Sequence, residues 1–224
     1  MEPDGVTVDH DLLDQQLAHW QEQLVSKPEM FGRDPSVPAR AADLLFAAEG
    51  VHDVLELGAG QGRDTVFFAA RGLRVYALDY TASGVQAIRD SAIRCGLGGA
   101  ITAAQHDVRD DLPYADGAFD ACYSHMLFNM ALTTAELARL AQEVRRVLRP
   151  GGLNIYSART TEDPHYGAGA DRGDNMFEVG GFIVHFFDDA LIRDLAEGYE
   201  LLTVERFEEG TLPRRLVRVV MRRP

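Results

Sequence analysis

The sequence is poor in lysine, and its positive charge comes almost entirely from arginine. Lys27 is the one lysine among 224 residues, and the formal net charge is −13. The arginines form no basic stripe along the chain, whereas a nucleic-acid-binding protein usually needs one to neutralise phosphates. We therefore expect a small-molecule partner and no nucleic acid, although arginines that are distant in the sequence could still cluster in space.

Cysteines and long hydrophobic runs are also scarce. Cys95 falls in a predicted helix and Cys122 in a predicted buried strand, which indicates reduced core thiols. No apolar run is long enough to span a membrane, and no charged-then-apolar leader opens the sequence, so we expect a cytoplasmic protein without a membrane partner. The length fits a single α/β domain over 1–224. The oligomeric state has no signature in the sequence.

Motifs for metal binding and for hydrolysis are missing. His125, His165 and His185 do not fall at metal-ligand spacing within one element, so we expect no metal, although the three could still converge in space. There is no serine nucleophile motif and no paired-carboxylate arrangement specific to hydrolysis.

The stretch 51–65, VHDVLELGAGQGRDT, organises the chain. An apolar run precedes Glu56 and three glycines at 58, 60 and 62, and a predicted helix follows at 64–71. This order is typical of a buried parallel strand that passes into its crossover helix, whose N-terminal amides face a ligand crevice. A second apolar run, 73–78, ends at Asp79, roughly 20 residues after the first glycine, where nucleotide-binding βαβ units hold ribose hydroxyls.

The glycine spacing differs from that of the two common nucleotide loops. A dinucleotide loop reads G-x-G-x-x-G and a phosphate loop reads G-x-x-x-x-G-K-[ST], but here Arg63 fills the third dinucleotide position and no lysine follows. The pattern E-x-G-x-G-x-G with a strand-end acid instead resembles the class I S-adenosylmethionine-dependent methyltransferases. Two later stretches, LPYADGAFDACYS at 112–124 and LRPGGLNIYS at 148–157, resemble the fourth and fifth strand motifs of that family.

The resemblance covers about 37–157 and implies a fold. That fold is an α/β, Rossmann-like, doubly wound and mostly parallel seven-stranded sheet with helices on both faces and an antiparallel C-terminal hairpin. Within the single domain, 1–36 would be an N-terminal lid helix and loop, 37–158 the cofactor-binding core, 159–187 a substrate-side insertion, and 188–224 the closing helix and hairpin. Asp9 or Asp11 is the expected cap of the lid helix. For Trp20 in that helix, core packing is favoured over a cofactor contact.

The resemblance also implies how S-adenosyl-L-methionine binds and leaves as S-adenosyl-L-homocysteine. Asp79 would bond the ribose, Tyr80 would stack beside the adenine, Asp107 would bond its amino group, the Val108 amide a ring nitrogen, and the Ser124 carbonyl the cofactor's amino group. For Asp107, turn capping is the alternative. The full predicted cofactor set is Glu56, Gly58, Ala59, Gly60, Gly62, Arg63, Asp79, Tyr80, Asp107, Val108 and Ser124.

The acceptor side is predicted around the end of the fourth strand and the insertion. His125 follows that strand directly, where the transferred methyl is expected, and can act as a base or be a structural histidine with equal weight. The insertion is too long for an ordinary connection, which is typical of a binding or lid element. The candidate catalytic residues are His125, His165 and Tyr166, and the candidate substrate-binding residues are Arg159, Arg172 and His185.

The expected activity is methyl transfer to a small molecule. The G-Q-G-R-D loop and the lid with its tryptophan resemble the tellurite-resistance and thiopurine-type methyltransferases, which favours a thiol or another soft nucleophile. One alternative is O- or N-methylation of a metabolite with a histidine base, since a hydroxyl or amine needs more help with its proton. The other is a non-catalytic module that senses S-adenosylmethionine, against which the long polar insertion argues weakly.

Overall fold

The computed structural model describes residues 10–210 and 214–224. In this part of the chain a seven-stranded sheet has the order β3-β2-β1-β4-β5-β10-β9. Its strands are β1 Asp53–Leu57, β2 Arg74–Asp79, β3 Ile101–Gln105, β4 Phe119–His125, β5 Leu148–Arg159, β9 Glu200–Glu209 and β10 Arg214–Arg222. Strands β1 to β5 are parallel, and β10 pairs antiparallel with both β5 and β9. The predicted Rossmann-like sheet with its antiparallel hairpin is confirmed.

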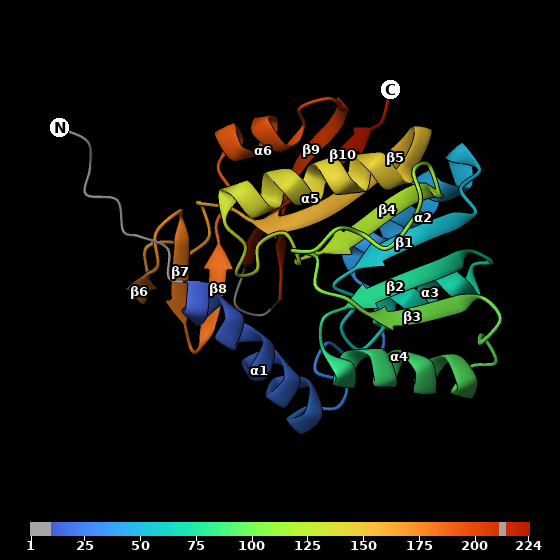
Figure 1. The fold of residues 1–224 in the computed structure, drawn as a ribbon, viewed down its shortest axis with the longest axis horizontal. Coiled ribbons are helices and arrows are strands. Elements are labelled where there is room, and N and C mark those ends of the chain that lie inside the picture. Colours follow the sequence, from blue (N-terminus) through green and yellow to red (C-terminus); the bar gives the residue numbers. More distant parts are fainter. Residues whose placement is uncertain (1–9, 211–213) are drawn as a thin grey trace.

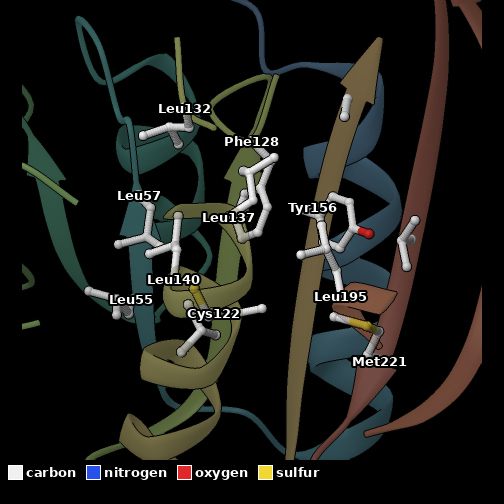
Figure 2. Packing of buried hydrophobic residues seen from close by; sticks show 14 of the residues in the cluster. Leu55, Leu57, Cys122, Phe128, Leu132, Leu137, Leu140, Tyr156, Leu195 and Met221 are labelled. Carbon is white, nitrogen blue, oxygen red and sulfur yellow. The ribbon is translucent and has the colours of Figure 1, made fainter. Parts of the chain in front are cut away.

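Helices cover both faces of this sheet (Figure 1). They are α1 His10–Ser26, α2 Val37–Glu49, α3 Arg63–Ala70, α4 Ala82–Arg94, α5 Thr134–Val147 and α6 Asp189–Leu195. One buried cluster joins α5 and α6 to Leu55 and Leu57 of β1, and the other joins α2, α3 and α4 to Val54. Alternate residues of a strand point to opposite faces, so a strand that is apolar throughout serves both layers. Figure 2 shows the α5 and α6 side of this packing.

Several helices begin where the side chains at their ends predict. Thr81 caps α4 by accepting the Gly84 N–H, and Asp188 caps α6 by accepting the Leu191 N–H. Thr133 forms a full capping box with Glu136 at the start of α5. Such caps satisfy amides that lack an intrahelical partner. Asp9, one of the two expected caps of α1, lies outside the described residues.

The insertion carries more structure than its composition predicts. It contains a three-stranded antiparallel sheet of β6 Ala170–Asp171, β7 Met176–Val179 and β8 Phe182–His185. Gly180 and Gly181 join β7 to β8 with φ of 61° and 85°, the left-handed conformation that tight hairpins need. Figure 1 shows that the arrowheads of β1 to β4 point towards α1 and this small sheet. The insertion therefore lies at the strand-end edge.

β5 begins at Leu148, because the chain turns straight from α5 into the sheet at 148–150. One expectation about a single residue was wrong. Cys95 is the exposed residue that ends α4 and is not a core thiol, whereas Cys122 is fully buried. Among the described residues, none of the helices combines the length and the apolar character that crossing a membrane requires.

Candidate cofactor and acceptor site

A cavity of about 590 Å³ lies at the carboxyl ends of the parallel strands. Its wall combines the loop after β1, the ends of β2 and β4, one side of α1, β8 and the end of the β9–β10 hairpin. Small-molecule pockets usually measure roughly 300–1,000 Å³, and open α/β sheets bind ligands at this edge. The cavity is therefore the candidate site.

Most of the predicted cofactor-binding residues line this cavity. They are Glu56, Gly58, Ala59, Gly60, Arg63, Asp79, Tyr80, Asp107 and Val108. Gly62 and Ser124 stand behind the wall: Gly62 is the residue before α3, and Ser124 is fully buried in β4. The individual cofactor contacts stay predictions.

The loop after β1 can be built only with glycine at its turning points. Gly58, Gly60 and Gly62 have φ of 66°, 55° and 82°. A Cβ atom on Gly58 would lie 2.8 Å from Leu127 Cβ, and one on Gly62 would lie 2.7 Å from Ile88 Cγ1. The loop is thus pressed against its neighbours on one side and leaves bare backbone towards the cavity on the other.

Asp79 joins the loop to the end of β2. Its Oδ2 accepts the Gly60 N–H at 2.8 Å, and its Oδ1 accepts the N–H and O–H of Thr81 at 2.9 and 2.6 Å. Burial raises the pKa of Asp79, and these three hydrogen bonds oppose that rise. A carboxylate offers about four acceptor positions, so about one remains for a ligand hydroxyl.

Gly84 also shapes the loop, and the sequence did not single it out. A Cβ atom at this position would lie 2.7 Å from the Gly60 carbonyl oxygen and 3.0 Å from Asp79 Oδ1. The first turn of α4 therefore packs directly on the loop and on its carboxylate. Because Gly84 has no positive φ, nothing in the local turn pattern marks it.

Glu56 lies buried beneath the loop, where Thr65 donates a hydrogen bond of 2.6 Å to its Oε2. Burial, reinforced by the nearby charge of Asp64, raises the pKa of Glu56 well above its usual value. The folded protein therefore holds a proton on this group at pH values where the unfolded chain has lost it.

Glu56→Gln should consequently stabilise the folded protein at neutral and alkaline pH. Because the folded pKa is raised, wild-type stability falls as pH rises from the unfolded value towards the folded one, by about 1.4 kcal/mol per pH unit. Glutamine keeps an oxygen for the Thr65 hydroxyl and has no charge to bury. Urea unfolding from pH 4 to 8 measures the effect. The control Glu49→Gln, at an exposed ion pair with Arg222, should lose stability with rising pH as the wild type does. The same loss in Glu56→Gln would contradict a buried, protonated Glu56.

The predicted adenine end of the cavity is closed by a charged cluster. Asp107 accepts hydrogen bonds from Arg109 Nε at 3.1 Å and from its terminal nitrogen at 2.7 Å, and Arg109 also pairs with Asp14 of α1. Burial raises the pKa of Asp107, but the Arg109 contacts outweigh it and the net change is downward. Arg109 was not predicted, since the partner Asp14 lies far away in the sequence.

Helix α1 is fastened over the cavity by amide side chains and aromatic contacts. Gln61 donates to the carbonyls of Leu24 and Lys27 at 3.1 and 3.0 Å. Trp20 packs with its ring centroid 4.8 Å from Phe182 and 6.5 Å from Phe31, and it also lines the cavity. Trp20 therefore both packs against its neighbours and forms part of the cavity wall.

On the acceptor side, His125, His165 and Arg159 reach the cavity wall. Arg159 is held by a buried ion pair with Asp163 and lies 5.2 Å from the centre of the Phe186 ring. His125 approaches Ser157 and Glu209, which lines the cavity from the end of β9. Glu209 was missed, because only the closed sheet brings the hairpin next to β4.

The remaining acceptor-side candidates have other partners. Tyr166 donates to Asn175 Oδ1 at 3.2 Å, Arg172 pairs with Glu178, and His185 is buried with Nδ1 2.7 Å from the Leu132 carbonyl oxygen. Burial lowers the pKa of His185. None of the three is part of the described cavity wall, and their predicted roles remain untested. Among the described residues, no three His, Cys, Asp or Glu side chains come together as a metal site.

The central part of this chain is similar in sequence to known methyltransferases. Residues 54–152 match the model of a family described as a methyltransferase domain. An uncharacterized methyltransferase of Mycobacterium tuberculosis is 35% identical over 118 residues, which cover 53% of this chain and 44% of the relative. A malonyl-[acyl-carrier protein] O-methyltransferase of Erwinia pyrifoliae is 37% identical over 109 residues, which cover 48% of this chain and 37% of the relative. The chain thus spans less than half the length of these curated relatives.

Solved structures share the fold. The 1,6-didemethyltoxoflavin-N1-methyltransferase of Burkholderia thailandensis, with bound 1,6-didemethyltoxoflavin and S-adenosylhomocysteine, has a TM-score of 0.74 at 16% identity and covers 99% of this chain and 92% of its own. An N-methyltransferase of Bradyrhizobium japonicum with S-adenosylhomocysteine has a TM-score of 0.70 at 14% identity and covers 94% of this chain and 100% of its own. The match of residues 54–152 to a methyltransferase domain agrees with the resemblance based on the glycine loop and the two strand motifs, and these structures share the fold that it implied.

Proposed function

We propose that this chain is a class I S-adenosylmethionine-dependent methyltransferase, which transfers a methyl group from S-adenosyl-L-methionine to a small-molecule acceptor; residues 54–152 match the model of a methyltransferase domain. The observation that carries the proposal is the glycine loop of the cavity. Gly58 and Gly60 expose bare backbone there, and Asp79 keeps an acceptor position beside them. The named relatives differ in their acceptors, so the residues of this chain's own cavity have to indicate its acceptor.

The residues of the cavity fit the cofactor from end to end. Asp79 offers an oxygen to a ribose hydroxyl at the end of β2, and Tyr80 and Val108 supply aromatic and apolar surface beside it for a flat base. The loop around Gly58 and Gly60 leaves room for the amino acid part, which the N-terminal end of α3 favours through its amides.

The bound cofactor supplies an electrophilic methyl group on a cationic sulfur. The chain then has to align the nucleophile, exclude water and accept a proton where the acceptor carries one. Trp20, Phe182 and Met130 give the cavity an apolar wall beneath α1 and the small sheet, which keeps water out. His125 and Glu209 supply polar groups on the acceptor side, a feature that a pure cofactor sensor does not need.

Removing the Asp79 carboxylate should weaken the binding of S-adenosylmethionine and S-adenosylhomocysteine. Losing hydrogen bonds to a charged group suggests about 1.5–3 kcal/mol, which corresponds to roughly 10- to 150-fold in affinity. Titration calorimetry on Asp79→Ala measures this. Asp90→Ala, on the exposed side of α4, is the matched control and should bind as the wild type does.

Two results would count against these assignments. Unchanged affinity in a folded Asp79→Ala protein would remove Asp79 from the cofactor site. Tight binding of NAD by the wild type without binding of S-adenosylmethionine would overturn the proposed activity itself.

A further inference from the structure

The His125 side chain connects three strands at the acceptor end of the cavity. Its Nδ1 lies 2.6 Å from Ser157 Oγ of β5, and its Nε2 lies 3.3 Å from Glu209 Oε2 at the end of β9. The side chains of His125 and Glu209 are only 11% and 20% exposed. Both residues belong to the cavity wall, so a bound acceptor would meet the pair in a nearly dry environment.

The hydrogen-bond partners of Ser157 fix the tautomer of His125. Ser157 is 1% exposed, and the Met126 N–H approaches its Oγ at 3.3 Å. An amide can only donate, and a buried hydroxyl needs an acceptor for its own hydrogen. Among the described residues, His125 Nδ1 is the acceptor within reach. Ser157 therefore donates to Nδ1, and the ring proton of a neutral His125 sits on Nε2, facing Glu209.

Glu209 is thereby held as an anion that is bonded on one side. The hydrogen bond from His125, with the positive charges of Arg63 and Arg214, keeps the pKa of Glu209 below its usual value although burial opposes this. His125 occupies Oε2, and no donor among the described residues bonds Oε1. One oxygen of a cavity-lining carboxylate is left to bind a hydrogen of the acceptor.

We propose that Glu209, oriented by His125, binds and receives the proton of an acceptor O–H or N–H group, so that the acceptor is an alcohol, a phenol or a nitrogen compound rather than a soft anion. This inference rests on the proposed methyl transfer. The proton leaves the acceptor heteroatom for Glu209 Oε1, while the heteroatom's lone pair forms the new bond to carbon and the carbon–sulfur electron pair stays on sulfur. An oxygen acceptor becomes strongly acidic as that bond forms, so a carboxylate suffices as its base, and a nitrogen acceptor becomes more acidic as it gains positive charge.

The same carboxylate disfavours the soft anions that the family resemblance suggested. A thiolate or an oxyanion placed beside Glu209 would meet a like charge in surroundings that screen it poorly. Arg63, which donates to the Phe31 carbonyl at 2.8 Å, and the exposed Arg214 are the cations that face Glu209. These arginines support the ionised state of Glu209 that the mechanism needs.

The tautomer can be tested without turnover. Nitrogen-15 spectra of the His125 ring, recorded on wild-type protein saturated with S-adenosylhomocysteine, should show the proton on Nε2 at pH values where the ring is neutral. Ser157→Ala should weaken this preference, because it removes the donor to Nδ1. A proton on Nδ1 in the wild type would overturn the arrangement on which the proposal depends.

The role of Glu209 can be tested with three acceptors of like size, namely phenol, benzylamine and thiophenol. Glu209→Gln should lower kcat with phenol and benzylamine by on the order of 10²–10⁴, and much less with thiophenol, while the Kd of S-adenosylhomocysteine stays unchanged. At acidic pH the kcat of the wild type should fall, because Glu209, which lies near His125, Arg63 and Arg214, takes up a proton. This fall should be absent in Glu209→Gln. Glu208→Gln, at the exposed neighbouring carboxylate that pairs with Arg215, is the matched control and should leave kcat and the pH profile unchanged.

Failure of this inference and failure of the proposed function give different results. If wild-type protein does not bind S-adenosylmethionine, the proposed function fails. If it binds the cofactor but methylates only thiophenol, or none of the three probes, the acceptor class is wrong. If Glu209→Gln keeps wild-type turnover and pH profile with phenol and benzylamine, Glu209 is not the proton acceptor.

Discussion

Replacing Gly60 with valine should severely weaken cofactor binding while the protein stays folded. Gly60 has a φ of 55° and donates its N–H to Asp79, so the turn and the predicted ribose-binding carboxylate depend on each other. A branched residue would relax out of this conformation, at a cost of about 1–3 kcal/mol to force it back, and its methyl groups would project towards the cavity and the Phe31 ring. The combined effect should weaken binding on the order of 100-fold or more.

Gly50→Val is the matched control for this substitution. Gly50 ends α2 with a φ of 66°, and a Cβ atom there would meet nothing within 4 Å. It carries the same backbone strain far from the loop, so it should lose stability and keep cofactor affinity. Calorimetry and urea unfolding of both variants separate strain from ligand contact. A folded Gly60→Val protein with wild-type affinity would show that this loop does not meet the cofactor.

Truncating Phe128 to alanine should produce the largest loss of stability. Phe128 is fully buried, and its ring stacks on Tyr156 with a centroid distance of 4.6 Å and an interplanar angle of 11°. Figure 2 labels both side chains, with Phe128 just beyond the end of β4 and Tyr156 on β5. Phe→Ala substitutions in cores cost about 3–5 kcal/mol through lost burial and the cavity left behind.

The loss should extend to the site, because the neighbours Leu127 and Asn129 line the cavity. Denaturant unfolding and cofactor titration on Phe128→Ala measure the two effects. Leu44 of α2 is 72% exposed. Leu44→Ala should therefore change stability by less than about 0.5 kcal/mol. Similar unfolding curves for the two variants would contradict the structural role assigned to the stacked rings.

The parts of the fold that depend on short stretches could be predicted from the sequence. The glycine loop, the strand that ends at Asp79 and the Thr81 cap are each determined within a few residues, and the structure has all three. Their positions fix the strand-end crevice, because every parallel strand delivers its last residue to the same edge.

Contacts between distant segments could not be predicted in this way. Arg109 meets Asp14 across 95 positions, and Glu209 meets His125 only after β10 has paired with β5 and β9 with β10. The small sheet of the insertion was missed for a related reason, since β6 to β8 have two to four residues each and too few alternations to stand out. The polar residues that we propose as partners of the acceptor are therefore brought together by the topology alone.

The one lysine of the chain lies where Gln61 is hydrogen-bonded to the end of α1, which has a practical use. Lys27 follows the last residue of that helix, its carbonyl accepts from Gln61 of the glycine loop, and its side chain is exposed beside Gln23. Apart from a free α-amino group, an amine-selective fluorophore would therefore attach only to Lys27, at the joint between the helix that covers the cavity and the loop beneath it. A fluorophore on Lys27 would lie where a movement of α1 during ligand exchange changes the surroundings of the dye and hence its emission.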